Sequence, residues 1–385
     1  MKKPTRKLLA ICVATCALQG NFTLAADTTF APSFSVAAVH DDNVFISDSG
    51  NPASDTFIRY TPGLTLDYNG DTLKLTGNYK QDGEKYQDNT QLDTNAARRI
   101  GNVSARWILT DRFSFDLGGQ YLNTPTPGEL NILTGFQQLG RLRSKREAVN
   151  TGVQYRFSPT LFSALSYSVS HDSAQTISDI KTHEANLDIT KDWSERLQLL
   201  FGHSYREYRF DDGSTLDTHT PTVGFAYDLT RQTTLRVEAG PRIFGDSDTV
   251  KPQIDVNVRH EYTTTGLLEV GYTRSETVLT GINDRVESET LSGSFTKDIG
   301  RNWNFSVRPS YGTVRNAGNK AKVSRFVADL RYNLTNYWYV NASYQYTRQQ
   351  DSFAANFNRV IPRNVILVGI NFSYPIRNGE QSQTR

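Results

Sequence analysis

The 385-residue sequence has almost no cysteine and, after its first residues, no long apolar run. Its two cysteines, Cys12 and Cys16, both lie near the N-terminus, so disulfides cannot stabilise the rest of the chain. A membrane-spanning helix needs about 20 mainly apolar residues. The longest uncharged run after residue 26 is Tyr332–Thr347, which has sixteen residues and is rich in Asn, Ser and Gln. The sequence therefore excludes a polytopic helical membrane protein.

The sequence also lacks an excess of charge of one sign. It has 42 basic and 40 acidic residues, and four of the basic residues (Lys2, Lys3, Arg6 and Lys7) lie in a segment that we expect to be removed. The remaining 38 basic and 40 acidic residues give a net charge of −2. This balance predicts no nucleic-acid partner. Aromatic residues make up 11% of the sequence and recur along it, which argues against disorder.

Residues 1–25 have the pattern of a secretory signal peptide. A basic head is followed by the apolar stretch Leu8–Leu18 and by the small-residue site Thr23-Leu24-Ala25. A buried N-terminal helix is one alternative. A lipoprotein signal with Cys16 as the lipidated residue is another, but Thr15 precedes it where a smaller residue is expected. The signal-peptide interpretation predicts an exported protein without disulfides.

The remainder of the sequence alternates with a period of two residues. In Trp338–Thr347 one face carries Trp338, Val340, Ala342, Tyr344 and Tyr346, and the other face carries Asn341, Ser343, Gln345 and Thr347. Such alternation predicts a β-strand between two different environments. No segment longer than about a dozen residues keeps a helical period.

Short turn signals recur at intervals of 33–48 residues, each between two strands with aromatic ends. They are Asn69-Gly70-Asp71, Thr110-Asp111-Arg112, Ser158-Pro159, Thr190-Lys191-Asp192, Thr230-Arg231-Gln232, Thr263–Gly266, Asp298–Arg301 and Leu334-Thr335-Asn336. Eight turns join sixteen strands, and Phe34–Phe45 and Val365–Tyr374 bring the number to eighteen. An even number of strands, with short turns at one end and longer loops at the other, predicts an all-β transmembrane antiparallel barrel of a Gram-negative outer membrane.

A soluble β-propeller or β-solenoid is the alternative for such a repeat, but one strand face here is repeatedly polar. Aromatic residues beside the turns predict an interfacial girdle: Tyr68, Trp107, Phe113, Tyr155, Phe157, Trp193, Tyr227, Tyr262, Trp303, Tyr332, Tyr337 and Trp338. The last predicted strand ends in aromatics, similar to the signal that the barrel-assembly machinery reads. We expect a barrel over residues 26–374 and a polar periplasmic tail over 375–385.

Three short segments near the N-terminus resemble a known family. Phe34-Ser35-Val36, His40-Asp41-Asp42-Asn43-Val44-Phe45 and Asp55–Leu64 resemble the N-terminal part of the β-barrel porin 2 family. The eighteen-strand pattern is similar to outer-membrane barrels of exopolysaccharide operons, the VpsM/EpsL kind. The resemblance implies export of an exopolysaccharide chain together with a short periplasmic polysaccharide-export protein. It implies no catalytic residues.

The residues give little sign of an enzyme. The six histidines (His40, His171, His183, His203, His219 and His260) have no metal-ligand spacing. Asp41-Asp42 and Asp211-Asp212-Gly213 would suit calcium, but turn geometry alone explains Asp and Gly in the second of these loops. We therefore expect no catalytic activity, no metal and no cofactor.

Alternation assigns many charged residues to the lumen. The bases are Arg59, Lys74, Lys80, Arg106, Arg156, Arg206, Arg236, Arg242, Arg259, Arg308, Arg325 and Arg331, and the acids are Asp67, Asp116, Glu184, Asp188, Asp228, Glu238, Asp255, Glu261, Glu269 and Asp329. Asn341 and Gln345 share this face. The charges either pair across strands and hold a wet lumen open, or form a mixed-charge path for a flexible sugar polymer.

The longest predicted connection is Asn123–Arg146. Leu130, Leu133 and Phe136, with Gln137 beside them, suit one side of a short helix within Glu129–Leu139. This loop either folds inward as a constriction, with Glu129, Phe136, Gln137, Arg141 and Arg143 as candidate residues, or lies outside. Its basic run (Arg141, Arg143, Lys145 and Arg146) would then contact acidic sugars or lipopolysaccharide phosphates.

The expected function is an outer-membrane pore for exopolysaccharide export. The alternatives are a general or specific small-solute porin and a structural or adhesive surface barrel without an open pore.

Overall fold

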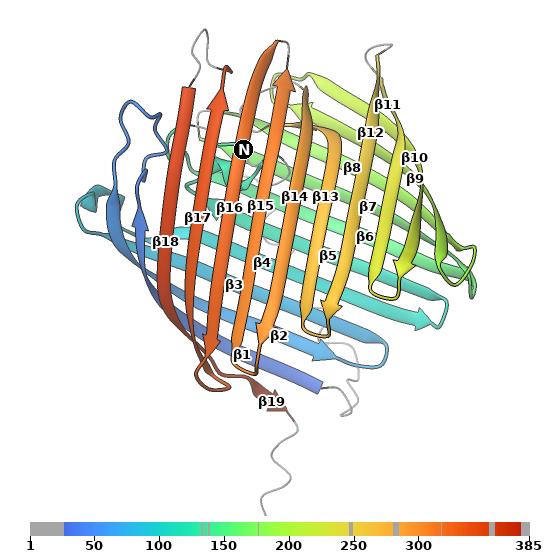
Figure 1. Ribbon diagram of the computed structural model, residues 1–385, viewed down its shortest axis with the longest axis horizontal. Helices are drawn as coiled ribbons and strands as arrows, with labels where there is room; N and C mark the ends of the chain where they lie inside the picture. Colours follow the sequence, from blue (N-terminus) through green and yellow to red (C-terminus); the bar gives the residue numbers. More distant parts are fainter. Residues whose placement is uncertain are drawn as a thin grey trace, which may run out of the picture.

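The computed structural model describes residues 27–131, 134, 136–137, 139–175, 177–245, 249–279, 285–316, 318–353 and 359–378. The expected signal peptide lies outside these residues. Eighteen long strands form one sheet, with a short nineteenth beside them (Figure 1). The strands are β1 (Asp27–Asp41), β2 (Asp55–Asn69), β3 (Leu73–Tyr86), β4 (Thr94–Thr110), β5 (Phe113–Thr124), β6 (Ser144–Ser158), β7 (Leu161–Ala174), β8 (Ile177–Asp192), β9 (Leu197–Phe210), β10 (Thr215–Thr230), β11 (Thr233–Phe244), β12 (Val250–Thr263), β13 (Gly266–Val278), β14 (Arg285–Ile299), β15 (Trp303–Asn316), β16 (Asn319–Asn333), β17 (Trp338–Asp351), β18 (Arg359–Ser373) and β19 (Ile376–Asn378).

Helical structure in the described residues is limited to two 3₁₀ turns, η1 (Thr90–Leu92) and η2 (Pro127–Glu129). None of the described segments is a helix with the length and apolarity that a membrane crossing requires.

The sheet closes on itself. Every long strand pairs antiparallel with its neighbours in sequence, and Ser33–Asp41 of β1 pairs with Val365–Ser373 of β18. Closure satisfies the backbone hydrogen bonds and leaves no long free edge, as a hydrocarbon environment demands. The predicted all-β antiparallel barrel with eighteen strands is thereby confirmed.

The strand ends agree with the sequence prediction at one rim and differ at the barrel seam. All eight predicted short turns lie at or beside connections of consecutive strands, from β2–β3 to β16–β17, but Thr190-Lys191-Asp192 is the end of β8 and the connection to β9 is residues 193–196. The first strand was predicted at Phe34–Phe45, but β1 ends at Asp41 and Asn43–Phe45 belong to the β1–β2 connection. β18 starts at Arg359, earlier than the predicted Val365. The predicted tail begins with β19, which pairs with Thr28–Phe30 of β1.

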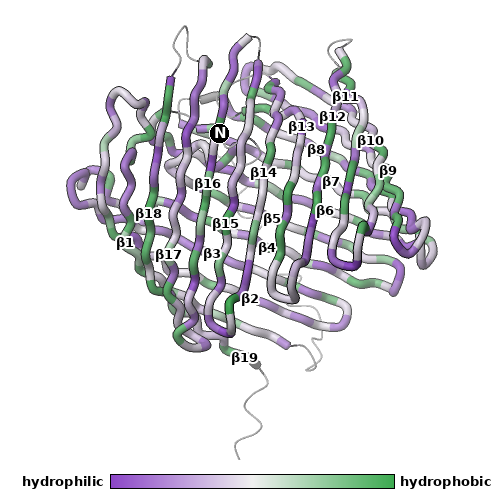
Figure 2. Tube along the Cα trace, viewed as in Figure 1, coloured by the Kyte–Doolittle hydropathy of each residue, from purple (hydrophilic) through white to green (hydrophobic). Residues whose placement is uncertain are grey.

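The outward face carries the exposed apolar side chains. Examples are Val223 (63% exposed), Leu165 (55%) and Val368 (52%). Figure 2 shows hydrophobic and hydrophilic positions interleaved along the strands. Near the short turns aromatic rings lie together in pairs across strands, such as Trp303–Tyr332 with ring centroids 4.5 Å apart and Trp338–Phe372 at 4.8 Å. These rings form one interfacial belt.

A second aromatic belt consists of outward-facing tyrosines nearer the long connections. Its members are Tyr60, Tyr79, Tyr121, Tyr167, Tyr205, Tyr272, Tyr311 and Tyr344. Beyond it the outer face carries ion pairs, including Lys145–Glu147 at 2.5 Å and Arg209–Glu207 at 2.7 Å. An apolar band between two aromatic belts on a closed barrel is the signature of an outer-membrane protein, so we assign the protein to the outer membrane of a Gram-negative bacterium. The extracellular part of the barrel projects beyond the hydrocarbon.

The buried residues gather in this projecting part. Three clusters of buried apolar side chains occur, centred on Val39 and Phe57, on Phe136 and Val314, and on Ile180 and Phe210. Their strand residues face inward. The buried apolar side chains thus gather in the extracellular part of the lumen, whereas the periplasmic part is lined by polar and charged residues.

Candidate functional site

The candidate site is the barrel lumen. Strand registers place all sixteen predicted lining residues on the face opposite the exposed apolar side chains; for example, Arg59 follows outward Ile58, and Arg156 lies between Tyr155 and Phe157. The set comprises Arg59, Lys74, Arg106, Arg156, Arg206, Arg236, Glu238, Arg242, Asp255, Arg259, Arg308, Arg325, Asp329, Arg331, Asn341 and Gln345. Their role in passage is a prediction that the fold does not test.

Many charges on the lumen wall form ion pairs. Ion pairs across neighbouring strands join Arg106 to Asp116 (2.6 Å), Arg206 to Glu184 (2.8 Å) and Arg308 to Asp329 (2.5 Å). Arg259 pairs with Glu261 (2.9 Å) on its own strand and with Glu269 (3.6 Å) on β13. Because acids and bases occur in similar numbers on the wall, the lumen is hydrophilic with little net charge.

The β5–β6 connection, residues 125–143, enters the lumen. Phe136 is 3% exposed and packs against Leu279, Val286, Val314 and Ala321, and its ring meets Phe353 edge-on with centroids 5.5 Å apart. Val286 lies on β14, nine strands from β5 (14 − 5), which is half of an eighteen-stranded circumference. The loop therefore reaches the far wall.

Polar contacts fix the loop at both ends of its path. The Gln137 N–H donates to Gln349 Oε1 (2.7 Å), and Gln349 Nε2 donates to the Gln137 carbonyl (2.9 Å). Nearer its start, Glu129 forms an ion pair with Arg98 on β4 at 2.7 Å. The predicted short helix within Glu129–Leu139 is absent from the described part of the loop, where only η2 is helical; Leu133 lies outside the described residues.

The basic run after the loop does not form one patch. Arg141 donates to Tyr86 Oη (2.9 Å) and pairs with Glu84 (3.3 Å) inside the lumen. Arg143 is exposed and donates to the Ala96 carbonyl, near the start of β4. The next two bases point in opposite directions: Arg146 pairs with Asp172 inside and Lys145 with Glu147 outside. Four of the five predicted constriction residues thus contact the lumen wall or its neighbouring loops, and Arg143 lies at the rim.

A second loop, β1–β2 (residues 42–54), also folds inward. Val44 and Ile46 are 0% and 1% exposed, the Gly140 N–H donates to the Ile46 carbonyl (3.2 Å), and Arg141 reaches the Val44 carbonyl. Sequence reasoning missed this loop by extending the first strand through Phe45. The run Val44-Phe45-Ile46, in which apolar residues cease to alternate, was the available signal.

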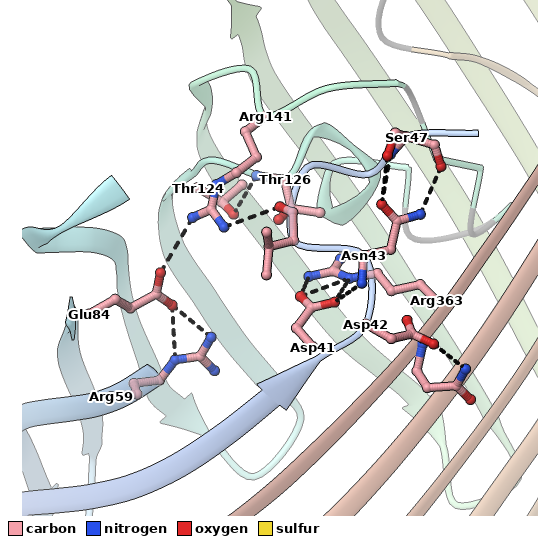
Figure 3. Close-up of polar contacts among 12 residues, drawn as sticks. Asp41, Asp42, Asn43, Ser47, Arg59, Glu84, Thr124, Thr126, Arg141 and Arg363 are labelled. Carbon is pink, nitrogen blue, oxygen red and sulfur yellow. Dashed lines mark hydrogen bonds and ion pairs between the residues drawn. The ribbon is translucent and has the colours of Figure 1, made fainter. Parts of the chain in front are cut away.

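Two aspartates where this loop begins form ion pairs and hydrogen bonds within the protein. Asp41 pairs with Arg363 at 2.6 Å and accepts from the Asn43 N–H, and Asp42 accepts two hydrogen bonds from Asn364 (Figure 3). They join the β1–β2 loop to β18 across the barrel seam. Figure 3 also shows Glu84 between Arg59 and Arg141, which connects the wall to the β5–β6 loop.

Ile46 is the one described non-glycine residue with a positive φ, +53°. A β-branched residue in the left-handed region is strained by about 1–3 kcal/mol. Asn43 holds this turn, because its carbonyl accepts from the Ile46 N–H and its Oδ1 accepts from the Ser47 N–H. The inward fold of the loop is therefore imposed by specific contacts.

The structure brings together no metal-binding cluster in the residues that it describes. No group of three His, Cys, Asp or Glu side chains is arranged for a metal among them. His203 is on the outward face with Phe201, and its ring lies 5.7 Å from that of His219.

The sequence matches no protein-family model, so the resemblance to the β-barrel porin 2 family does not assign the chain to it. No curated protein matches the sequence either. Among solved structures, OccK3 (OpdO) of Pseudomonas aeruginosa is similar over 90% of this chain and 96% of its own, with 11% identity and a TM-score of 0.48. OpdQ of the same organism is similar over 91% and 98%, with 10% identity and a TM-score of 0.47. The siderophore receptor PirA of P. aeruginosa is similar over 90% and 80%, with 10% identity and a TM-score of 0.44. Similarities this low assign neither a family nor a solute.

Proposed function

We propose that the protein is an outer-membrane channel for passive diffusion of small hydrophilic solutes, narrowed by its β5–β6 loop. One observation carries this proposal: the loop crosses the lumen and docks Phe136 on the opposite wall, above a lumen lined by paired charges. A polar, water-filled interior provides the path through hydrocarbon. The inward loop limits the size of what passes.

Planar-bilayer recording of the purified protein tests this function. The wild type should give discrete channel currents. Deleting Thr126–Gln138 removes both the Phe136 and the Gln137 contacts and should raise single-channel conductance while the barrel still assembles. Slower gel migration after boiling than before it will show that the variant is folded. Absence of wild-type currents would contradict the channel, and unchanged conductance after the deletion would contradict the constriction.

Export of an exopolysaccharide chain is a second candidate. The near balance of lumen acids and bases favours it, because a wall with little net field lets a long sugar polymer slide without tight binding. This function would require a periplasmic polysaccharide-export protein as partner. Lipopolysaccharide and the barrel-assembly machinery would be partners under either function.

A strain lacking the gene separates the two candidates. Loss of surface polysaccharide with normal uptake of small solutes would support export. Normal surface polysaccharide with slower growth on one small solute would support the diffusion channel. Normal behaviour in both assays, together with no bilayer conductance, would favour a structural or adhesive barrel.

A further inference from the structure

The lumen contains a recess directly on the periplasmic side of the β5–β6 loop. It has a volume of about 330 Å³ and is bounded by β12 to β16, with Arg308, Arg325, Ser292, Ser310 and Asn257 in its lining. The loop sits just above it. The Thr134 carbonyl lies 3.7 Å from where a Cβ on Gly312 would stand, and Gly312 is the next inward residue of β15 after Ser310. The recess therefore opens on the lumen beside the loop, within reach of a solute that approaches the loop from the periplasm.

The charges of the residues that line the recess do not cancel. Glu269 is engaged by Arg259 at 3.6 Å and by the Ser294 hydroxyl at 3.4 Å, and Arg308 is engaged by Asp329. Arg325 forms no ion pair with any carboxylate of the described residues. Glu129 of the loop is near enough to act on Arg325 electrostatically, but its ion pair is with Arg98. Arg259 lies outside the recess and is shared with Glu261 at 2.9 Å. Among the residues that line the recess, the two bases Arg308 and Arg325 face the one acid Glu269, an excess of one positive charge.

We propose that this recess binds the carboxylate of monoanionic solutes in transit, a proposal that rests on the channel function above. The Arg325 guanidinium offers parallel N–H donors that match the two oxygens of a carboxylate. The hydroxyls of Ser292 and Ser310 and the amide of Asn257 add neutral donors from β14, β15 and β12, on the same stretch of wall. One net positive charge balances one carboxylate, whereas a phosphate dianion would bring a second charge without a partner.

Gluconate and glucose are suitable probes, because they have similar size and differ by one carboxylate. Gluconate added on the periplasmic side should reduce the potassium chloride current through wild-type channels, and glucose at the same concentration should not. In the Arg325→Ala variant the concentration needed for half block should rise about tenfold or more, as expected when a charge-assisted contact is lost. Arg325→Lys keeps the charge but loses the planar fork of donors. Its concentration for half block should therefore lie between those of the wild type and Arg325→Ala.

Lys322→Ala is the matched control, because Lys322 is an exposed base on the outward face of the same strand. It should leave gluconate block within twofold of wild type. Heat-modifiable gel migration will show that each variant has assembled.

The outcomes distinguish the two proposals. Absence of wild-type current would overturn the channel function itself. Current with equal effects of gluconate and glucose would overturn only the carboxylate site. Block that is unchanged in Arg325→Ala, or fully retained in Arg325→Lys, would show that a diffuse field rather than this recess attracts the anion.

Discussion

Gln349 on β17 and Gln137 in the β5–β6 loop hold each other through two hydrogen bonds although 212 residues separate them in sequence. The Gln349 side chain presents its oxygen and nitrogen to the Gln137 backbone as a neighbouring strand would. It is fully buried, and its Nε2 also donates to Asp351, which Arg359 holds at 2.8 Å. The loop is thus tied to a wall residue that is itself fixed.

Replacing Gln349 with Ala should loosen the loop. Two neutral hydrogen bonds of about 1 kcal/mol each are lost, and the Gln137 backbone groups lose their partners. We expect more frequent excursions to higher conductance in bilayer recordings. The control is Gln345→Ala, because Gln345 is an inward residue of the same strand with no hydrogen bond to the described part of the loop. Equal current fluctuations in the two variants would refute the role of this pair.

Phe136→Ala tests the apolar half of the loop anchor. The ring fills a space formed by side chains of β14, β15, β16 and two connections, and deleting a buried ring costs about 3–5 kcal/mol. This loss destabilises the docked position of the loop and not the strand pairing. Barrel assembly should therefore be normal while conductance rises. Phe157→Ala, at a ring 55% exposed on the outer face, should change neither. Wild-type conductance in Phe136→Ala would mean that the ring does not hold the constriction.

Glu84→Gln should weaken the contact between the wall and the same loop. The Glu84 side chain is 5% exposed and lies between Arg59 and Arg141, which are 30% and 15% exposed. Removing its charge leaves two guanidiniums facing each other, at a cost of about 2–4 kcal/mol. The temperature at which the boiled gel form appears should fall.

Asp116→Asn is the control for that change, because the Arg106–Asp116 pair is 47% and 25% exposed and should contribute about 0–1 kcal/mol. If this temperature falls equally in the two variants, burial of Glu84 has no special effect on stability.

The strands and their turns could be predicted from sequence because their signals are local. A period of two residues distinguishes the two faces of a strand, so Arg331 and Asn341 could be assigned inward and Leu330 and Val340 outward without any knowledge of partners. Turn residues such as Asn69-Gly70-Asp71 mark the periplasmic rim for the same reason.

The packing inside the lumen could not be predicted because it depends on distant residues. Nothing near Phe136 indicates Val314, and nothing near Asp41 indicates Arg363, 322 residues away. The tyrosine belt was also missed, because the connections beside it vary in length and give no common marker. β19 was missed since three residues are too few for a periodic signal.

Arginine substitutions test the assignment of faces along the whole barrel. Val340 and Ile370 pair across β17 and β18 on the outward face, and Ile370 is 43% exposed. Arginine at either position should cost about 2–4 kcal/mol near the bilayer midplane and reduce the folded fraction after refolding into lipid vesicles. Asn341 and Asn371 are joined by a hydrogen bond of 2.6 Å on the inward face, where a guanidinium meets water. Arginine at either of these positions should therefore refold as the wild type does. If both pairs of variants refold equally well, the strand register is displaced by one residue, which would exchange the lipid and lumen faces throughout.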